Sequence, residues 1–257
     1  MLVLGGRSFA SVGGGFRFNC GLTTGGAAYC WGNGQFGQLG NGLTADSPLP
    51  VLVSGGITFT SVVIGFVRAC GIAAVGAAYC WGDNRNGGIG DGTTNNAPVP
   101  VPVSGGLRFA SLSVGEGATC GVTAAGAAWC WGQNLSGQLG DGTSTSRLAP
   151  VPVSGGVVFA ALDLGNSHTC GLEVGGRPYC WGANDDGELG DGTTVQRVVP
   201  TAVGGGLTLS SISAGQSFTC GVTTSGVGYC WGRNGSGAGG NGSYTGTTLP
   251  TRVAGQP

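Results

Sequence analysis

The segment Thr119-Cys120-Gly121-Val122-Thr123-Ala124-Ala125-Gly126-Ala127-Ala128-Trp129-Cys130-Trp131-Gly132 occurs, with limited changes, five times in the 257-residue chain. The copies follow one another at a spacing of 50 residues without an insertion or a deletion. The repeated landmarks are the cysteines at 20/30, 70/80, 120/130, 170/180 and 220/230 and the tryptophans Trp31, Trp81, Trp131, Trp181 and Trp231. A constant period of this length is typical of a repeat protein, in which each unit buries its apolar face against a neighbour.

The third copy shows the strand pattern of one repeat. Residues 109–114 alternate apolar and small polar side chains, as a half-buried strand does. Residues 119–123 and 127–131 predict a hairpin, because Gly126 supplies the left-handed conformation that its three-residue turn needs. Residues 150–153 predict a fourth strand, whose prolines suit a sheet edge. Each copy is therefore expected to form four antiparallel strands without a helix.

This pattern predicts an all-β fold, a β-propeller of five four-stranded blades that occupies residues 1–257 as one repeat domain. A solenoid is the alternative, but it favours one strand per shorter repeat. The expected blades cover approximately residues 7–54, 57–104, 107–154, 157–204 and 207–254. Residues 1–4 are then expected to be a surplus strand of a preceding blade, which predicts that the chain is a monomer or part of a longer array.

Charge and hydropathy narrow the classes of partner. The formal net charge is −1, so no basic surface is expected and nucleic acid is not a predicted partner. No apolar run approaches the roughly 18 residues that cross a bilayer, so no membrane span is predicted. The N-terminal segment, residues 1–6, lacks the charged and apolar regions of a signal peptide.

The stretch Thr119–Asn134, followed by Gly137-Gln138-Leu139-Gly140-Asp141-Gly142-Thr143, resembles the regulator of chromosome condensation repeat in all five copies. The resemblance implies a β-propeller, commonly of seven blades, of which this chain is then a fragment. The cysteine-bearing form resembles repeats of bacterial exported and cell-surface proteins. The founding member promotes guanine-nucleotide exchange, but the match here covers the scaffold motif alone, so that activity is not carried over.

The cysteines of each hairpin lie symmetrically about the middle turn residue. Residues that oppose each other on neighbouring antiparallel strands have Cα atoms roughly 4.5–5.5 Å apart, which suits a disulfide. We predict five bridges, each within its own blade: Cys20–Cys30, Cys70–Cys80, Cys120–Cys130, Cys170–Cys180 and Cys220–Cys230. Reduced, buried cysteines are the alternative. Five bridges predict an oxidising compartment, extracellular or at the cell surface.

The sequence predicts no enzyme, no cofactor and no metal ion. It contains no nucleophile-elbow, phosphate-loop or zinc-hydrolase motif. A zinc site needs four ligands, whereas each copy offers two cysteines and the whole chain one histidine, His168. Residues 235–240 match a dinucleotide fingerprint in spacing, but no helix follows to bind a phosphate.

Strand alternation places the turn after the first strand and the long loop after the third strand at the same end of each blade. The copies differ most in these two segments, and aromatic and arginine side chains are favoured binding anchors. We predict partner-binding residues at this end: Phe16, Arg17, Phe18, Phe36, Phe66, Arg68, Arg85, Glu116, His168, Asp185, Asp186 and Phe218. The expected partner is a protein or a glycan.

Three alternatives to binding remain open from the sequence. The variable loops can reflect drift at tolerant positions, with the chain acting as a structural repeat segment of a larger surface protein. A central-channel enzyme or an exchange-factor-like regulator is less favoured, because the chain has few ionisable groups. The acidic group Asp185, Asp186, Glu188 and Asp191 could bind a cation or a basic partner, but a solvated loop is favoured because short charge clusters are usually solvated.

Overall fold

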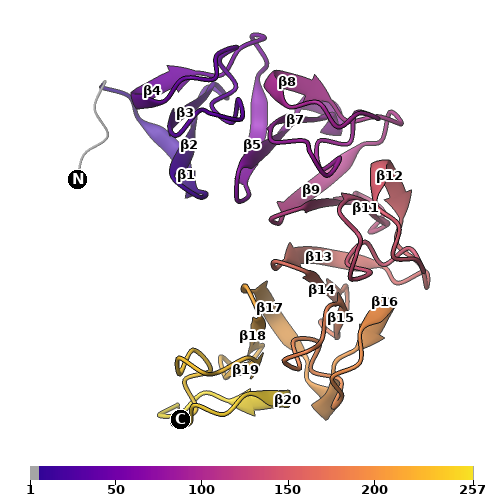
Figure 1. The fold of residues 1–257 in the computed structure, drawn as a ribbon. Helices are drawn as coiled ribbons and strands as arrows, with labels where there is room; N and C mark the ends of the chain where they lie inside the picture. Colours follow the sequence, from indigo (N-terminus) through magenta and orange to yellow (C-terminus); the bar gives the residue numbers. More distant parts are fainter. Residues whose placement is uncertain (1–5, 257) are drawn as a thin grey trace.

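Each repeat forms one antiparallel sheet whose four strands are hydrogen-bonded in chain order. The structure is a computed structural model that describes residues 6–256, so the predicted surplus strand at residues 1–4 lies outside the described residues. The five sheets fan around a common hub as an open arc, and the first and fifth sheets flank its opening (Figure 1). The predicted five-bladed, all-β propeller is thereby confirmed.

The strands have nearly the same bounds in every blade. The first blade contains β1 (Phe9–Gly14), β2 (Phe18–Thr23), β3 (Ala28–Gly32) and β4 (Ser47–Leu52). The second contains β5 (Phe59–Ile64), β6 (Arg68–Ala73), β7 (Ala78–Gly82) and β8 (Ala97–Pro102). The third contains β9 (Phe109–Val114), β10 (Ala118–Thr123), β11 (Ala128–Gly132) and β12 (Arg147–Pro152).

The fourth blade contains β13 (Phe159–Leu164), β14 (His168–Glu173), β15 (Pro178–Gly182) and β16 (Arg197–Ala202). The fifth contains β17 (Leu209–Ala214), β18 (Phe218–Thr223), β19 (Gly228–Gly232) and β20 (Thr247–Arg252). Two single 3₁₀ turns, η1 (Ala74–Gly76) and η2 (Gly204–Gly206), are the helical elements among residues 6–256. The fourth strand of the third blade begins at Arg147, three residues before the predicted start, because Arg147 pairs with Gly132 beyond a bulge.

The hairpin register places the cysteines of each blade directly opposite each other. In the third blade Cys120 pairs with Cys130, and Gly126 has a φ of 79° in the turn between them. All five predicted disulfides are present, with Cα atoms 4.0 to 4.1 Å apart. The described residues contain no free cysteine.

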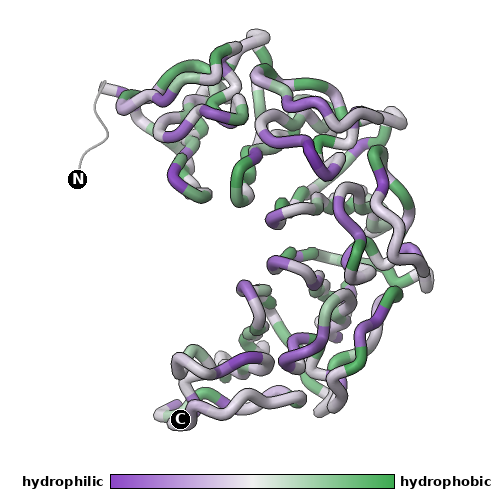
Figure 2. The backbone as a smooth tube through the Cα atoms, viewed as in Figure 1, coloured by the Kyte–Doolittle hydropathy of each residue, from purple (hydrophilic) through white to green (hydrophobic). Residues whose placement is uncertain are grey.

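From the second blade to the fifth, a buried tryptophan of the β-hairpin joins each blade to the preceding one. The indole N–H of Trp131 donates to the carbonyl oxygen of Gly88 in the preceding blade at 2.9 Å, and its side chain is fully buried. The same bond recurs from Trp81 to Gln38, from Trp181 to Gln138 and from Trp231 to Glu188. Hydrophobic stretches (green) recur in every blade along the tube of Figure 2.

In the second and fourth blades the aromatic residue two positions before the tryptophan packs inside its own blade. Tyr79 lies edge-on to Phe59 at 6.4 Å between ring centroids, and Tyr179 lies edge-on to Phe159 at 6.3 Å. These two tyrosine rings therefore pack against neighbouring rings within the blade. Side chains that can contact a partner lie instead in the loops at the ends of the blades.

Candidate functional site

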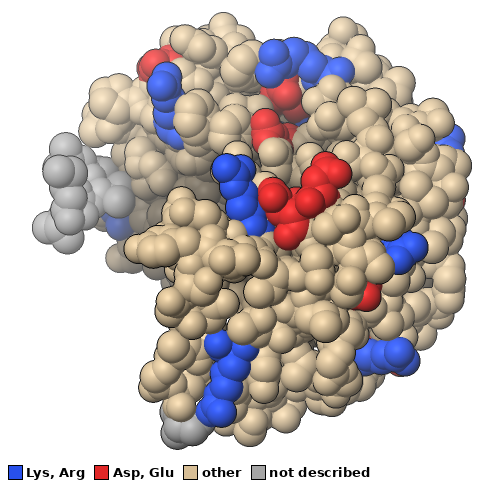
Figure 3. Space-filling view, turned by 60° about the horizontal axis from the view of Figure 1, so that its bottom comes forward, with Lys and Arg blue, Asp and Glu red and all other residues tan. Residues whose placement is uncertain are grey.

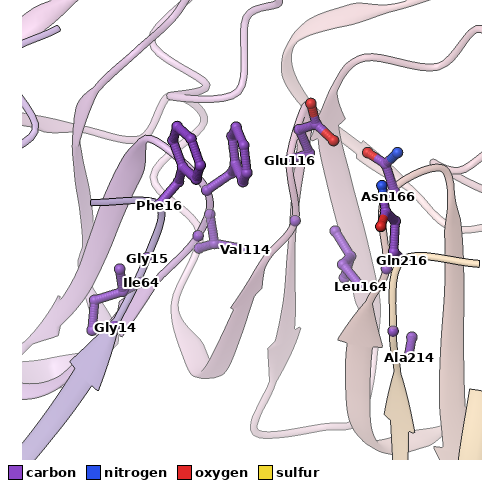
Figure 4. Close-up of a pocket in the computed structure, with 15 residues that line it drawn as sticks. Gly14, Gly15, Phe16, Ile64, Val114, Glu116, Leu164, Asn166, Ala214 and Gln216 are labelled. Carbon is purple, nitrogen blue, oxygen red and sulfur yellow. The ribbon is translucent and has the colours of Figure 1, made fainter. Parts of the chain in front are cut away.

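The turns after the innermost strands surround the mouth of the hub. They form a cavity of about 530 Å³ to which every blade contributes the same three repeat positions. The lining residues are 14–16, 64–66, 114–116, 164–166 and 214–216. The third position of each set carries Phe16, Phe66, Glu116, Asn166 and Gln216. The mouth is therefore aromatic on the first two blades and polar on the other three (Figure 4).

Phe16 and Phe66 form a stacked pair at this mouth. Their ring centroids lie 4.5 Å apart with an interplanar angle of 14°, although the side chains are 45% and 41% exposed. The backbone N–H of Phe16 also donates to the carbonyl oxygen of Phe66 at 2.8 Å. Two neighbouring blades thus present one continuous aromatic surface to solvent.

Arg17 adopts a conformation that is unusual for a residue other than glycine. Its φ is 63°, and its guanidinium carbon lies 4.9 Å from the ring centroid of Phe16. Non-glycine residues in this region cost on the order of 1–3 kcal/mol and persist where the surrounding contacts hold them. Here the bond from Phe16 to Phe66 and the ring stack supply those contacts.

A second cavity of about 220 Å³ adjoins the aromatic pair. Turns and long loops both line it, so these two kinds of segment meet at one end of the blades. Its lining is Phe16, Arg17, Asn33, Gln35, Phe36, Phe66, Val67, Asp83, Arg85, Asn86 and Glu116. Arg85 lies over the ring of Phe36 at 4.6 Å and donates from Nε to the Asp83 carboxylate at 2.6 Å. Six of the twelve predicted residues therefore gather here: Phe16, Arg17, Phe36, Phe66, Arg85 and Glu116.

Arg68 does not reach the surface. Its side chain is 1% exposed, and Nη2 donates to the backbone carbonyl of Glu116 in the next blade at 2.7 Å. Nε and Nη1 are buried without a hydrogen-bond partner. Burial lowers the pKa of Arg68 from its ordinary value to about 10, and the carboxylate of Asp83 counteracts part of that shift. The prediction that Arg68 contacts a partner directly is corrected by this burial.

Phe18, His168 and Phe218 occupy the same repeat position as Arg68. Phe18 and His168 are 1% and 2% exposed, and Phe218 is half-buried against Gly215. This position begins the second strand of each blade, and its side chain turns between blades rather than outward. Phe18 and His168 are therefore interior residues, out of reach of a partner at the surface.

The acidic residues grouped in the fourth blade by the sequence analysis differ in their exposure to solvent. Asp185 and Asp186 are exposed, whereas Glu188 is buried and accepts the backbone N–H of Asp186 at 2.9 Å. Burial raises the pKa of Glu188. Asp191 is tied to Arg197 at 2.8 Å, which leaves Asp185 and Asp186 as the available acids. Charged side chains of both signs gather near the middle of the face in Figure 3, where most of the remaining surface is uncharged.

Two residues of the mouth, Asn166 and Gln216, were absent from the predicted set. Their signal in the sequence is positional, because they occupy the repeat position of Phe16 and Phe66 in the fourth and fifth blades. Asp83 was missed as well. It lies in the variable part of a long loop, and its pairing with Arg85 two residues away was the available clue.

A carboxylate on the inner wall of the hub links neighbouring blades. A cavity between the inner strands contains one ionisable lining residue, Asp163. Its Oδ2 accepts the backbone N–H of Ala214 at 2.8 Å, and its Oδ1 accepts the hydroxyl of Ser113 at 3.3 Å. Asp163 thus connects three successive inner strands, β9, β13 and β17.

Two kinds of feature are absent from residues 6–256. No group of three or more histidine, cysteine or acidic side chains is arranged there to hold a metal ion. The described part of the chain also has no helix of the length and apolar character needed to cross a membrane.

The repeats define a protein class. The model of the regulator of chromosome condensation (RCC1) repeat matches residues 25–65, 76–122, 125–172 and 175–222, and a second RCC1 repeat model matches residues 9–38, 109–138 and 209–238. These matches cover most of the chain. The chain belongs to the RCC1 repeat family, in the form whose hairpins carry paired cysteines.

Three solved structures superpose on the fold. Human WBSCR16 has a TM-score of 0.86 at 23% identity, covering 95% of this chain and 67% of its own. Yeast RCC1 (Prp20), solved bound to Kap60, has a TM-score of 0.83 at 20% identity, covering 96% and 61%. The ectodomain of the Physcomitrella patens receptor kinase CR4 has a TM-score of 0.61 at 24% identity, covering 89% and 52%. The chain thus spans about half to two thirds of these solved chains, and comparison with curated proteins returned no match.

Proposed function

We propose that this chain is a binding module that recognises a protein partner at the mouth of the hub, and that it works outside the cell. The observation that carries the proposal is the stacked pair of Phe16 and Phe66, which stays over 40% exposed. Aromatic side chains, phenylalanine included, and arginine are enriched at protein interfaces relative to the rest of the surface. A polar half of the same mouth, at Glu116, Asn166 and Gln216, supplies hydrogen-bonding groups around that anchor.

Two further observations support the proposal. Five disulfides within the hairpins are typical of proteins from oxidising compartments, which favours export and agrees with the bacterial exported form of the repeat. The solved yeast relative Prp20 is described in complex with Kap60 and as binding Gsp1p and histones. Asp163 also favours binding over catalysis. Both oxygens of its carboxylate already accept hydrogen bonds, from the backbone N–H of Ala214 and the hydroxyl of Ser113, so it is not free to act on a substrate.

The test compares two variants of the chain in affinity capture from the medium or cell envelope of its source. Phe16→Ala/Phe66→Ala removes the stack, and Tyr244→Ala, which removes an exposed aromatic ring from the fifth blade, is the control. Thermal denaturation should show both variants folded, because substitutions of exposed residues usually cost little.

We expect the double variant to lose a protein that the wild type and Tyr244→Ala both retain. Retention of the same proteins by all three chains would instead support the structural-segment alternative. If a glycan, but no protein, prevented the capture, the partner recognised at this mouth would be a carbohydrate.

A further inference from the structure

Arg17 and Arg85 line the 220 Å³ cavity, and Arg68 lies behind its lining. Each of the three has side-chain N–H groups that make no hydrogen bond among the described residues. The guanidinium group of Arg17 contacts the ring of Phe16 and makes no hydrogen bond or ion pair within residues 6–256. The Nε–H of Arg85 donates to Asp83, and its two terminal amino groups make no hydrogen bond among the described residues. The Arg85 side chain is 64% exposed. Behind the lining, Arg68 holds Nε and Nη1 without a partner.

The charge of this region is positive. Asp83 and Glu116 provide two carboxylates against the three guanidinium groups, which leaves one positive charge. The Asp83 carboxylate is 5% exposed and already bonded to Arg85, so it is not available to a cationic ligand. Arg68 is fully buried, where a charge acts through a lower effective dielectric than at the surface. The cavity therefore favours a single negative charge.

The walls of the cavity are aromatic. Phe16, Phe66 and Phe36 line it, and the guanidinium groups of Arg17 and Arg85 lie over two of these rings. These contacts keep the arginines oriented beside the apolar surface. At about 220 Å³ the cavity is smaller than the roughly 300–1,000 Å³ of sites for separate small ligands, and it suits a pair of side chains from a larger partner.

We propose that this cavity binds an acidic segment of the partner, in which an aspartate or glutamate lies next to an aromatic side chain. This inference rests on the proposed function, since it names the chemistry recognised at the same end of the propeller. The carboxylate is placed between Arg17 and Arg85, and the ring is placed against Phe16 and Phe66. A carboxylate fits better than a doubly charged phosphate, because Asp83 and Glu116 border the site and repel additional negative charge.

The experiment uses blocked octapeptides with a glycine–serine background and one central pair. The pair is Asp-Phe in the test peptide and Asn-Phe, Asp-Ala, Lys-Phe or phosphoserine-Phe in the comparison peptides. Binding to the full chain is measured by NMR chemical-shift changes up to about 1 mM peptide, the range of a contact worth on the order of 4 kcal/mol. We expect Asp-Phe to bind at least about tenfold more tightly than Asn-Phe, Asp-Ala and Lys-Phe.

Matched variants of the chain link the result to the cavity. Arg17→Gln/Arg85→Gln should weaken Asp-Phe binding by about tenfold or more, whereas Arg233→Gln, an exposed arginine of the fifth blade, should leave it unchanged. The inference is overturned if Asn-Phe binds as tightly as Asp-Phe, or if phosphoserine-Phe binds more tightly. It is also overturned if Arg233→Gln weakens binding as much as the double variant does, or if no peptide binds. The proposed function is tested separately by the capture experiment with Phe16→Ala/Phe66→Ala, so the two failures are distinguishable.

Discussion

His168 Nε2 lies 2.9 Å from the hydroxyl oxygen of Thr219, across the boundary between the fourth and fifth blades. The Thr219 hydroxyl donates its own proton to the carbonyl oxygen of Glu188 at 2.9 Å. Thr219 must therefore accept from His168, so Nε2 carries the proton of a neutral imidazole. Burial lowers the pKa of His168 from 6.5 to about 4, because a charged ring is costly in this interior.

His168 predicts a loss of stability in mild acid. The unfolded chain binds a proton at this side chain below about pH 6.5, whereas the folded chain does so only near pH 4. Stability should therefore fall as the pH decreases through this window, by up to about 3 kcal/mol. Urea denaturation at several pH values measures the slope, and His168→Gln should remove it while keeping an N–H donor. Parallel slopes for the wild type and the variant contradict this assignment.

Arg68 and Gly88 are predicted to be energetically coupled. A Cβ atom at Gly88 would lie 1.4 Å from Nη1 of Arg68, so the two positions share one space. The third blade has Ala118 and Gln138 at these positions, and Gln138 Oε1 accepts the backbone N–H of Ser136 at 2.9 Å. We expect Gly88→Gln alone to cost about 1–3 kcal/mol by overpacking.

The double variant Arg68→Ala/Gly88→Gln should recover much of that loss, because it reproduces the pair of the third blade. A double-mutant cycle from denaturant unfolding should give a coupling energy of about 1 kcal/mol or more. Additive effects of the two substitutions would show that the side chains do not compete for the same space.

The hairpin disulfides are expected to be intact and independent. Native protein treated with iodoacetamide should gain no mass without a reductant, and peptide mapping should recover only pairs within one hairpin. Removing one bridge with Cys120→Ala/Cys130→Ala should lower the free energy of unfolding by roughly 2–3 kcal/mol, since 10 residues separate the cysteines. Labelled thiols or bridges between blades would contradict the hairpin register.

The elements that the sequence predicted well are those set by local contacts. Cys120 and Cys130 are joined by a single turn, and the left-handed Gly126 sets the register between them. The repeat then multiplies this result five times. The predicted start of the strand of residues 147–152, at residue 150, is three residues too late. The first residue, Arg147, pairs with Gly132 only across a bulge.

The candidate site was predicted in part. The variable loops were assigned to one end of the blades, and six of the predicted residues line one cavity there. Phe18, Arg68 and His168 were grouped with them because they adjoin the turns in sequence. They are the first residues of second strands, whose side chains turn between blades, and that direction depends on how one blade packs on the next.

The sequence alone determined the repeat, the four strands of each blade and the cysteine pairs, since these follow from side-chain alternation and turns over fewer than about 50 residues. The tertiary structure decided which loop residues meet. Phe16 and Phe66 are separated by 50 residues, and their 4.5 Å stack exists because two blades are held at one angle around the hub. The hydrogen bond from the indole N–H of Trp81 to the carbonyl oxygen of Gln38 joins the same two blades, and it too is a contact between units that no pattern within one unit contains.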